Sequence, residues 1–420
     1  MIDIKLLREN PEKVKKACEN KQAKVDVDLV VELDKKRRVL IQEIEGFRAE
    51  QKKIAYSPRP GSAFRGKDQI EQAKELKNKI KELEPELEKA EKEFNEMFLK
   101  IPNLPLDNVI VGKNEAENKT LREWSPPSFV KTTEGKKDYL EIAEALDIID
   151  VKRAAKVSGA RFGYLKGDLA LLEFGLIQLA METTRKERFI PIVPPVMIKP
   201  EMMKAMGYVE RGGDEIYYFD KDNLYLTGTS EQSIGPLHAD EVFEEKDLPK
   251  RYIAFSTCFR REAGSYGKDT KGILRVHQFD KVEMFIFCRP EDSLKEHELI
   301  LSMEEKSMQE LKIPYRVVDI CSGDLGDPAA KKYDIEAWMP GQNEYRETHS
   351  TSNCTDFQAR RLNIKYKDKQ GKLNLVHTLN GTAFAIGRTL IAIIENYQQK
   401  DGSIEVPKVL QKYVGIKKIG

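Results

Sequence analysis

Residues 30–54 read VVELDKKRRVLIQEIEGFRAEQKKI, in which the side chains expected to pack recur at alternating intervals of three and four residues. This heptad spacing is typical of a helix that packs along a seam against another helix. The spacing stops at residues 57–62, which are rich in proline and glycine, and resumes over residues 73–97. Because the two segments can bury their seams against each other, we expect an antiparallel helical hairpin. The expected seam consists of Val30, Leu33, Arg37, Leu40, Ile44, Phe47, Gln51 and Ile54, followed by Ala73, Leu76, Ile80, Leu83, Leu87, Ala90, Phe94 and Met97.

The two expected helices differ in charge. Residues 35–53 carry seven basic and three acidic side chains, whereas residues 71–96 carry six lysines and nine glutamates. One interpretation is that the excess charges pair across the hairpin. The other is an arm that contacts nucleic-acid phosphates, and the charge pattern alone leaves both open. The candidate phosphate contacts are Lys35, Lys36, Arg38, Arg48, Lys52 and Lys53.

The composition excludes several classes of protein. The 420 residues include 71 Lys and Arg against 70 Asp and Glu, so net charge alone indicates no polyanionic partner. The hydrophobic fraction of 40% is too high for a disordered chain. The most apolar stretch, residues 169–181, is shorter than the roughly 20 residues that a membrane span needs, and we interpret it as a buried helix.

The cysteines and the N-terminus indicate a cytoplasmic protein. Five cysteines lie far apart with no C-x-x-C pair, which argues against a disulfide scaffold and against a structural zinc site. The first residues lack the order of a signal peptide. We expect a short helix within residues 1–27, with Asn10 as its N-cap and Pro11 at its first position.

Beyond a linker at residues 101–105, strand-like and helix-like segments alternate irregularly. Neighbouring strands between helices favour an α+β fold with an antiparallel sheet. No G-x-G-x-x-G or P-loop is present. We expect strands at residues 189–193, 217–226, 252–259, 279–287 and 315–319, and a final helix from about 382 to 395.

Residues 259–262 and 275–283 form the first of four clusters that could carry chemistry. The guanidinium of Arg260 could hold phosphate oxygens, and Glu262 could accept a hydrogen bond from the exocyclic amine of a base. Phe279 offers a flat ring on which a base could stack. The alternative is an ordinary surface hairpin with ion pairs.

The other three clusters also allow two interpretations each. Residues 227–231 place hydroxyls beside a carboxylate, which could bind an amine or cap a helix. Glu347 and Ser350 could offer oxygens to Mg²⁺, or belong to a polar strand edge. Residues 379–388 predict a glycine-bearing turn that opens a helix, with Arg388 either functional or extending from a core helix to solvent.

In this order and at these distances, the clusters resemble the three signature motifs of class II aminoacyl-tRNA synthetases. The chain is most similar to the seryl-tRNA synthetases of the common zinc-free type, and the resemblance covers essentially its whole length. The matching segments are residues 6–11, the heptad hairpin, 101–103, 111–113, 159–164, 279–283, 356–361 and 379–381.

The resemblance implies an α+β protein of two domains. Residues 1–105 would form an N-terminal tRNA-binding domain with a coiled-coil hairpin at about 30–100. Residues 106–420 would form a class II catalytic domain, an antiparallel sheet flanked by helices. Motif 1 would lie at about 186–200, motif 2 at about 252–288 and motif 3 at about 379–397.

The resemblance also implies roles for single residues. Arg260, Arg275 and Arg388 would be catalytic and hold the phosphates of ATP. The remaining ATP-binding residues would be Arg261, Glu262, Val276, Phe279, Glu347, Thr348, His349 and Ser350. Serine would be bound by Thr229, Ser230, Glu231, Glu283, Asn380 and Thr382. Glu347 and Ser350 would also hold Mg²⁺, no zinc is expected, and Pro195 would lie at a dimer interface.

The implied function is that of a serine–tRNA ligase. Such an enzyme activates L-serine with ATP to seryl-adenylate and pyrophosphate, then transfers serine to the 3′-terminal adenosine of tRNA(Ser). The implied protein is a homodimer without membrane or DNA partners, and tRNA(Sec) is a candidate second substrate. Two alternatives remain open at this point: a ligase that loads a carrier protein, and a non-catalytic synthetase paralogue that acts as a binding protein.

Overall fold

The computed structural model describes residues 1–56, 67–127, 129–210, 213–263 and 271–420. These residues divide into two compact units, Met1–Pro102 and Asn103–Gly420. Within the described residues, no helix combines the length and apolar character needed to cross a membrane. All five cysteines are buried free thiols.

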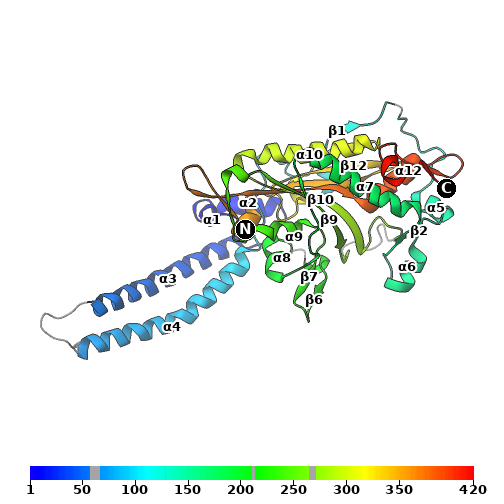
Figure 1. Cartoon of the computed structure of the whole chain (residues 1–420). Coiled ribbons are helices and arrows are strands. Elements are labelled where there is room, and N and C mark those ends of the chain that lie inside the picture. Colours follow the sequence, from blue (N-terminus) through cyan, green and yellow to red (C-terminus); the bar gives the residue numbers. More distant parts are fainter. Residues whose placement is uncertain (57–66, 128, 211–212, 264–270) are drawn as a thin grey trace. The chain divides into compact units, whose positions relative to one another are not determined.

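The first unit is entirely helical (Figure 1). It contains α1 (Ile4–Glu9), α2 (Pro11–Asn20), α3 (Val27–Tyr56) and α4 (Lys67–Phe98). The expected single helix near the N-terminus is in fact two, because Pro11 has no N–H with which to continue α1. The predicted cap is confirmed, since the Asn10 side chain accepts a hydrogen bond from the Lys13 backbone N–H at 3.0 Å.

The helical hairpin is confirmed, with α3 and α4 side by side. Every predicted seam position is buried or half-buried. The basic seam residue Arg37 places its guanidinium 4.5 Å from the centre of the Phe94 ring. Helix α4 continues through Pro85, which lies on the exposed face. The Pro/Gly segment at residues 57–62 lies outside the described residues.

The second unit is built on an eight-stranded sheet in the order β1-β11-β12-β13-β16-β10-β9-β4. All neighbouring strands run antiparallel except β4 and β9, so the predicted antiparallel sheet is confirmed. Its strands are β1 (Lys119–Trp124), β4 (Ile190–Ile192), β9 (Lys250–Phe259), β10 (Gln278–Cys288), β11 (Tyr315–Asp319), β12 (Lys331–Met339), β13 (Glu344–Asn353) and β16 (His377–Ala385).

Shorter elements surround this sheet. The helices are α5 (Tyr139–Ala145), α6 (Val151–Ser158), α7 (Asp168–Arg185), α8 (Pro200–Met206), α9 (Glu231–Ile234), α10 (Ser293–Glu310), α11 (Phe357–Leu362), α12 (Ile386–Tyr397) and α13 (Gln411–Val414). The small sheets pair β2 (Ile149–Asp150) with β3 (Tyr164–Leu165); β5 (Met197–Ile198) and β6 (Tyr218–Phe219) with β7 (Leu224–Leu226); β8 (Val242–Glu244) and β15 (Leu373–Leu375) with β14 (Lys365–Lys367); and β17 (Ile404–Glu405) with β18 (Lys418–Ile419).

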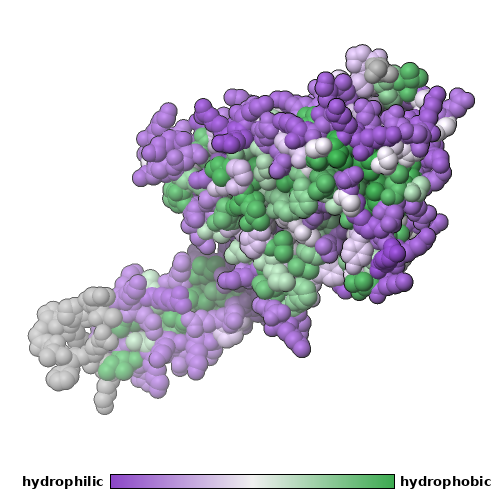
Figure 2. All heavy atoms as spheres, turned by 45° about the vertical axis from the view of Figure 1, so that its right-hand side comes forward, coloured by the Kyte–Doolittle hydropathy of each residue, from purple (hydrophilic) through white to green (hydrophobic). Residues whose placement is uncertain are grey.

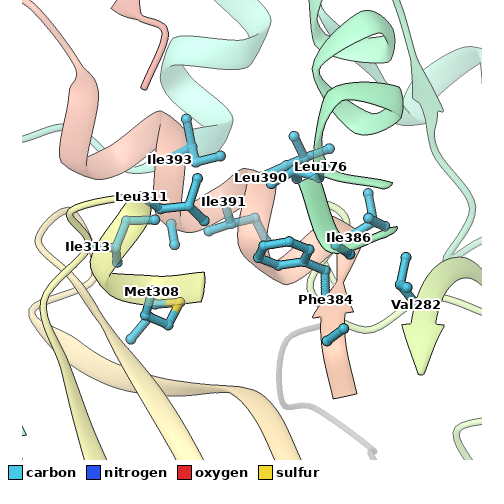
Figure 3. Close-up of a cluster of buried hydrophobic side chains, with 14 of the residues drawn as sticks. Leu176, Val282, Met308, Leu311, Ile313, Phe384, Ile386, Leu390, Ile391 and Ile393 are labelled. Atoms are coloured by element: carbon cyan, nitrogen blue, oxygen red, sulfur yellow. The ribbon is translucent and has the colours of Figure 1, made fainter. Parts of the chain in front are cut away.

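The core of the second unit lies where α7, α10 and α12 cover one face of the sheet. Figure 3 shows Leu176, Met308 and Ile391 from these helices around Phe384 and Val282 of the sheet. The predicted buried helix at residues 169–181 is therefore confirmed as part of α7.

The alternation of side chains along β10 shows which of them face a cavity on the side of the sheet opposite to this core. Val282 and Met284 belong to the core just described, whereas Phe285 belongs to a second cluster that α8, α9 and α11 cover. Since Lys281 and Glu283 alternate with Val282, they point to the side of Phe285, and they line a cavity there.

Two predicted elements are wrong. Residues 217–226 form a hairpin of β6 and β7, because Asp220, Asp222 and Asn223 favour a turn. Residues 379–385 are the end of strand β16, and the final helix starts only at Ile386. Gly381 is not a turn residue, since a Cβ there would lie 2.2 Å from Cγ2 of Ile300, and helix α10 could not approach the strand.

Candidate active site

A cavity of about 820 Å³ opens over β10, β13 and β16. Most of the predicted small-molecule contacts line it: Thr229, Glu231, Arg260, Glu262, Arg275, Val276, Phe279, Glu283, Glu347, Thr348, Ser350, Asn380, Thr382 and Arg388. Ser230, Arg261 and His349 are not among the lining residues. The structure thus brings together residues that are as far apart in the chain as Thr229 and Arg388.

Arg260 leaves the end of β9 and is held in place by its neighbours. Its Nε donates a hydrogen bond to the Gly228 carbonyl oxygen at 3.1 Å, and its guanidinium carbon lies 5.3 Å from the centre of the Phe279 ring. Its backbone N–H donates to the His277 carbonyl oxygen at 3.0 Å. The guanidinium therefore points into the cavity beside an aromatic face.

The two residues after Arg260 point in different directions. The guanidinium of Arg261 lies over the Tyr217 ring, at 5.6 Å, and its backbone N–H donates to Glu215. Glu262 has a positive φ of 51° and places a carboxylate oxygen 3.7 Å from Nη1 of Arg275. Residues 264–270, between Glu262 and Arg275, lie outside the described residues.

Three side chains meet at the other end of the cavity. Oε2 of Glu283 accepts a hydrogen bond from the Thr382 hydroxyl at 3.2 Å and lies 2.7 Å from Nζ of Lys281. Lys281 was not among the predicted site residues, although its position two residues before Glu283 puts both side chains on one face of the strand.

Glu231 lies in the same region and is buried. The Tyr208 hydroxyl donates a hydrogen bond to its Oε1. Burial raises the pKa of Glu231 to about 8, the charge of Glu283 adds to the rise, and Lys281 and Arg260 oppose it. Tyr208 follows α8 and belongs to none of the motifs, so no signal in the sequence indicated it.

The hydroxyl groups of residues 227–231 do not cap a helix. Ser230 precedes α9, which has only four residues, and makes no side-chain cap hydrogen bond. The hydroxyl oxygens of Thr227, Thr229 and Ser230 are buried and have no hydrogen-bond partner in the part of the chain that the structure describes. Since buried polar groups are normally paired, the Thr229 hydroxyl on the cavity wall is available to a ligand.

Strand β13 brings Glu347 to the cavity. It lies between β12 and β16, but its ladder with β16 covers only residues 351–353, so residues 345–350 are paired on the β12 side alone, as expected of a polar strand edge. Nη1 of Arg388 lies 3.2 Å from Oε2 of Glu347 and also donates to its backbone oxygen. Burial opposes ionisation, but the charges of Arg388, Lys332 and Arg260 outweigh it and lower the pKa of Glu347 to about 2.

Comparison with known proteins shows to which family the chain belongs. The seryl-tRNA synthetase N-terminal domain matches residues 1–105, and the class II core domain shared by the G, H, P, S and T tRNA synthetases matches residues 217–397. A serine–tRNA ligase of Dictyoglomus turgidum is 47% identical over 423 residues, which cover 100% of this chain and 99% of that protein. The chain belongs to the seryl-tRNA synthetase family.

Solved structures of the seryl-tRNA synthetase family share the fold over the whole chain. The enzyme from Pyrococcus horikoshii, complexed with ATP, matches with a TM-score of 0.92 and 42% identity, covering 100% of this chain and 99% of that one. The cytoplasmic enzyme from Naegleria fowleri, in complex with AMP, gives 0.87 and 36%, covering 100% and 98%. The predicted family, fold class and serine–tRNA ligase activity are therefore confirmed.

His349 lies behind the seryl-tRNA synthetase cavity. Its Nε2 is 3.0 Å from the Ala383 carbonyl oxygen, which can only accept, so Nε2 carries the proton. Burial lowers the pKa of His349 to about 4, and the ring is neutral. The hydrogen bond from the ring thus links β13 to β16 beyond the backbone ladder of the two strands, which ends where Thr351 faces Gly381. We therefore assign no ligand contact to His349, nor to Ser230 and Arg261.

A divalent cation fits one side of the synthetase cavity. Glu347 is ionised and Ser350 adds a hydroxyl, a set suited to Mg²⁺, which takes one or two carboxylates together with phosphates and water. Among the described residues, no three His, Cys, Asp or Glu side chains gather in a way that could hold a metal alone. A nucleotide would therefore have to complete the coordination.

Proposed function

We propose that the cavity binds L-serine and ATP side by side and forms seryl-adenylate. The observation that carries the proposal is the placement of Arg260 on the cavity wall. The Gly228 carbonyl oxygen, next to Thr229, accepts a hydrogen bond from its Nε, and its guanidinium lies beside the Phe279 ring. One guanidinium can therefore hold the α-phosphate and the serine carboxylate together, which is the arrangement that a bond between them requires.

The first step needs no general base. The serine carboxylate is ionised at neutral pH, with a reference pKa of about 3.5, and attacks the α-phosphorus as pyrophosphate leaves. Negative charge spreads over the phosphates, and we assign its stabilisation to Arg260, Arg275 and Arg388. Phe279 would stack on adenine, Glu262 would accept from its amine, and the buried Val276 would contact it through apolar surface.

We assign the opposite end of the cavity to the rest of serine. Glu231, Glu283 and Thr229 would contact the ammonium group. Thr382 and Asn380 would contact the serine side chain near its hydroxyl group. A site that pairs a hydroxyl rejects alanine strongly, because its own buried polar groups would remain unpaired. Threonine keeps the hydroxyl, so only the limited space for its additional methyl group excludes it.

We assign Mg²⁺ to Glu347 and Ser350. When bound, the ion neutralises charge on the phosphates of ATP. Arg388 holds the Glu347 carboxylate in place from the start of α12. Thr348 lines the same wall, and its hydroxyl donates to the Ile335 carbonyl oxygen, so its role here is to shape the wall.

We propose that the first unit binds tRNA(Ser), with tRNA(Sec) as a candidate second substrate. Arg38 pairs with Asp34, and Arg48 pairs with Glu84 across the hairpin, so part of the basic charge serves the helices themselves. Lys35, Lys36, Lys52 and Lys53 are exposed on α3 and are the candidates for phosphate contacts.

We further propose a homodimer that works in the cytoplasm. Large apolar side chains are exposed along α7 and near β4, namely Leu171, Phe174, Ile190, Val193 and Met197. Pro195 lies in the same stretch of chain and is also exposed. Figure 2 shows apolar residues at the surface of one face of the second unit, with polar ones around them. Exposed apolar surface of this kind marks protein–protein contacts.

Aminoacylation of purified tRNA(Ser) with radiolabelled serine tests the proposal. We expect serine to become attached to tRNA(Ser), at a rate that depends on ATP and Mg²⁺. Transfer of serine to a carrier protein in place of tRNA would support the carrier-protein alternative. No transfer to either, with no adenylate formed, would support the non-catalytic paralogue.

A further inference from the structure

Glu304 is a buried acidic residue behind the floor of the cavity. It lies on α10, which packs against β16, and it is 0% exposed. A Cβ atom on Gly381 would lie 2.8 Å from Oε1 of Glu304, so the carboxyl group rests directly against the strand. Asn380 and Thr382, on either side of Gly381, line the cavity, whereas Glu304 does not.

The surroundings of Glu304 favour its neutral form. Burial raises its pKa well above the ordinary value, and the negative charges of Glu283, Asp334 and Glu305 act in the same direction. The backbone of Thr382 acts in the opposite direction. Taken together, these surroundings disfavour the charged form of Glu304.

A buried acid of this kind costs free energy and needs a reason. Neither oxygen of Glu304 has a well-formed hydrogen bond to any described residue. An apolar side chain of the same size would avoid the cost of removing a polar group from water. The packing against Gly381 is the contact through which the residue can act on the cavity.

We propose that Glu304 is a positioning residue for the amino-acid end of the cavity: its carboxyl group, which lies against Gly381, holds β16 so that the Thr382 hydroxyl reaches Glu283. The inference rests on the proposed roles of Thr382 and Glu283 in binding serine.

Serine-dependent exchange of pyrophosphate into ATP by the full chain tests this inference. We expect Glu304→Ala to raise the KM for serine about tenfold, because β16 loses its support beside Thr382, and to change the KM for ATP less than about twofold. We expect Glu304→Gln to stay within about threefold of the wild type, because the amide has the same shape and lies against Gly381 in the same way.

Met308→Ala is the matched control. Met308 lies one helical turn further along α10, is equally buried, and packs in the core of Figure 3 away from the cavity. Its truncation leaves a similar void without touching Gly381, and both KM values should remain as in the wild type. If Glu304→Ala does not fold, Glu304→Met replaces it, with the same side-chain length and no polar oxygen.

Several outcomes would overturn the inference. They are equal changes in both KM values, a Glu304→Gln enzyme as impaired as Glu304→Ala, and a serine KM that no Glu304 variant changes. If serine drives no exchange with the wild type, the proposed function itself fails.

Discussion

The Thr382 hydroxyl donates a hydrogen bond to Oε2 of Glu283 from the neighbouring strand, with 3.2 Å between the two oxygens. Both residues line the cavity, and they face each other in the register of β10 and β16. The hydroxyl therefore orients the carboxylate that we assign to serine, and its methyl group takes up space beside it.

Replacement of Thr382 by valine keeps the shape and removes the hydroxyl. We expect kcat/KM for serine in pyrophosphate exchange to fall about tenfold, because Glu283 loses one of its donors. Thr382→Ser is the matched variant, since it keeps the hydroxyl and removes only the methyl group. It should keep the serine rate and raise activation of threonine relative to serine by up to about tenfold. Equal rates of serine activation by the Thr382→Val and Thr382→Ser variants would contradict the role of the hydroxyl.

Glu347→Gln removes the charged ligand that we assign to Mg²⁺. We expect the concentration of Mg²⁺ for half-maximal exchange to rise at least about tenfold, while the KM for serine changes little. Glu344→Gln on the same strand is the control, because Glu344 is exposed and pairs with Arg346. A Mg²⁺ titration that is the same for both variants would remove Glu347 from the metal site.

Serine binding should release protons near neutral pH. The pKa of Glu231 is raised to about 8, so this carboxyl group carries a proton in the free protein at pH values below that. The ammonium group of serine favours the charged form, and the proton then leaves. Isothermal titration calorimetry in two buffers of different ionisation enthalpy measures the release. We expect serine affinity to rise with pH towards about 8, and Glu231→Gln to show no release. Proton uptake on binding would contradict this assignment.

Charge reversal at Lys35, Lys36, Lys52 and Lys53 tests the arm. We expect the KM for tRNA(Ser) to rise more than about tenfold and the salt dependence of charging to weaken, because four phosphate contacts are lost. Pyrophosphate exchange should not change, since it requires no tRNA. Reversal of Lys89 and Lys92 on α4 is the control within the same hairpin. Unchanged tRNA charging would show that the lysines of α3 only keep the hairpin in solution.

The parts of the fold with regular periodicity could be predicted from the sequence. The heptad spacing gave the hairpin and its seam, because burial of one helical stripe repeats with a fixed period. The antiparallel sheet followed from runs of strand-like segments. In contrast, Gly381 suggested a turn, and only the packing of Ile300 against β16 shows why a glycine is needed there.

The site could be predicted only where its residues stand in motifs. Arg260, Glu283 and Arg388 were named because their order along the chain resembles a known family. Tyr208 and Glu304 reach the cavity region from elements with no motif of their own, and their contacts depend on tertiary packing. His349 is the opposite case, since it stands beside Glu347 and Ser350 in one of the four clusters but lies behind the cavity wall.

Exchange of labelled pyrophosphate into ATP, with each amino acid offered singly, tests the central claim most directly. The account predicts exchange that depends on Mg²⁺ and on serine, with threonine far slower and alanine slower still. Exchange driven by a different amino acid would contradict the assignment of Glu231, Glu283 and Thr382 to serine. No exchange with any amino acid would contradict the claim that this cavity activates an amino acid at all.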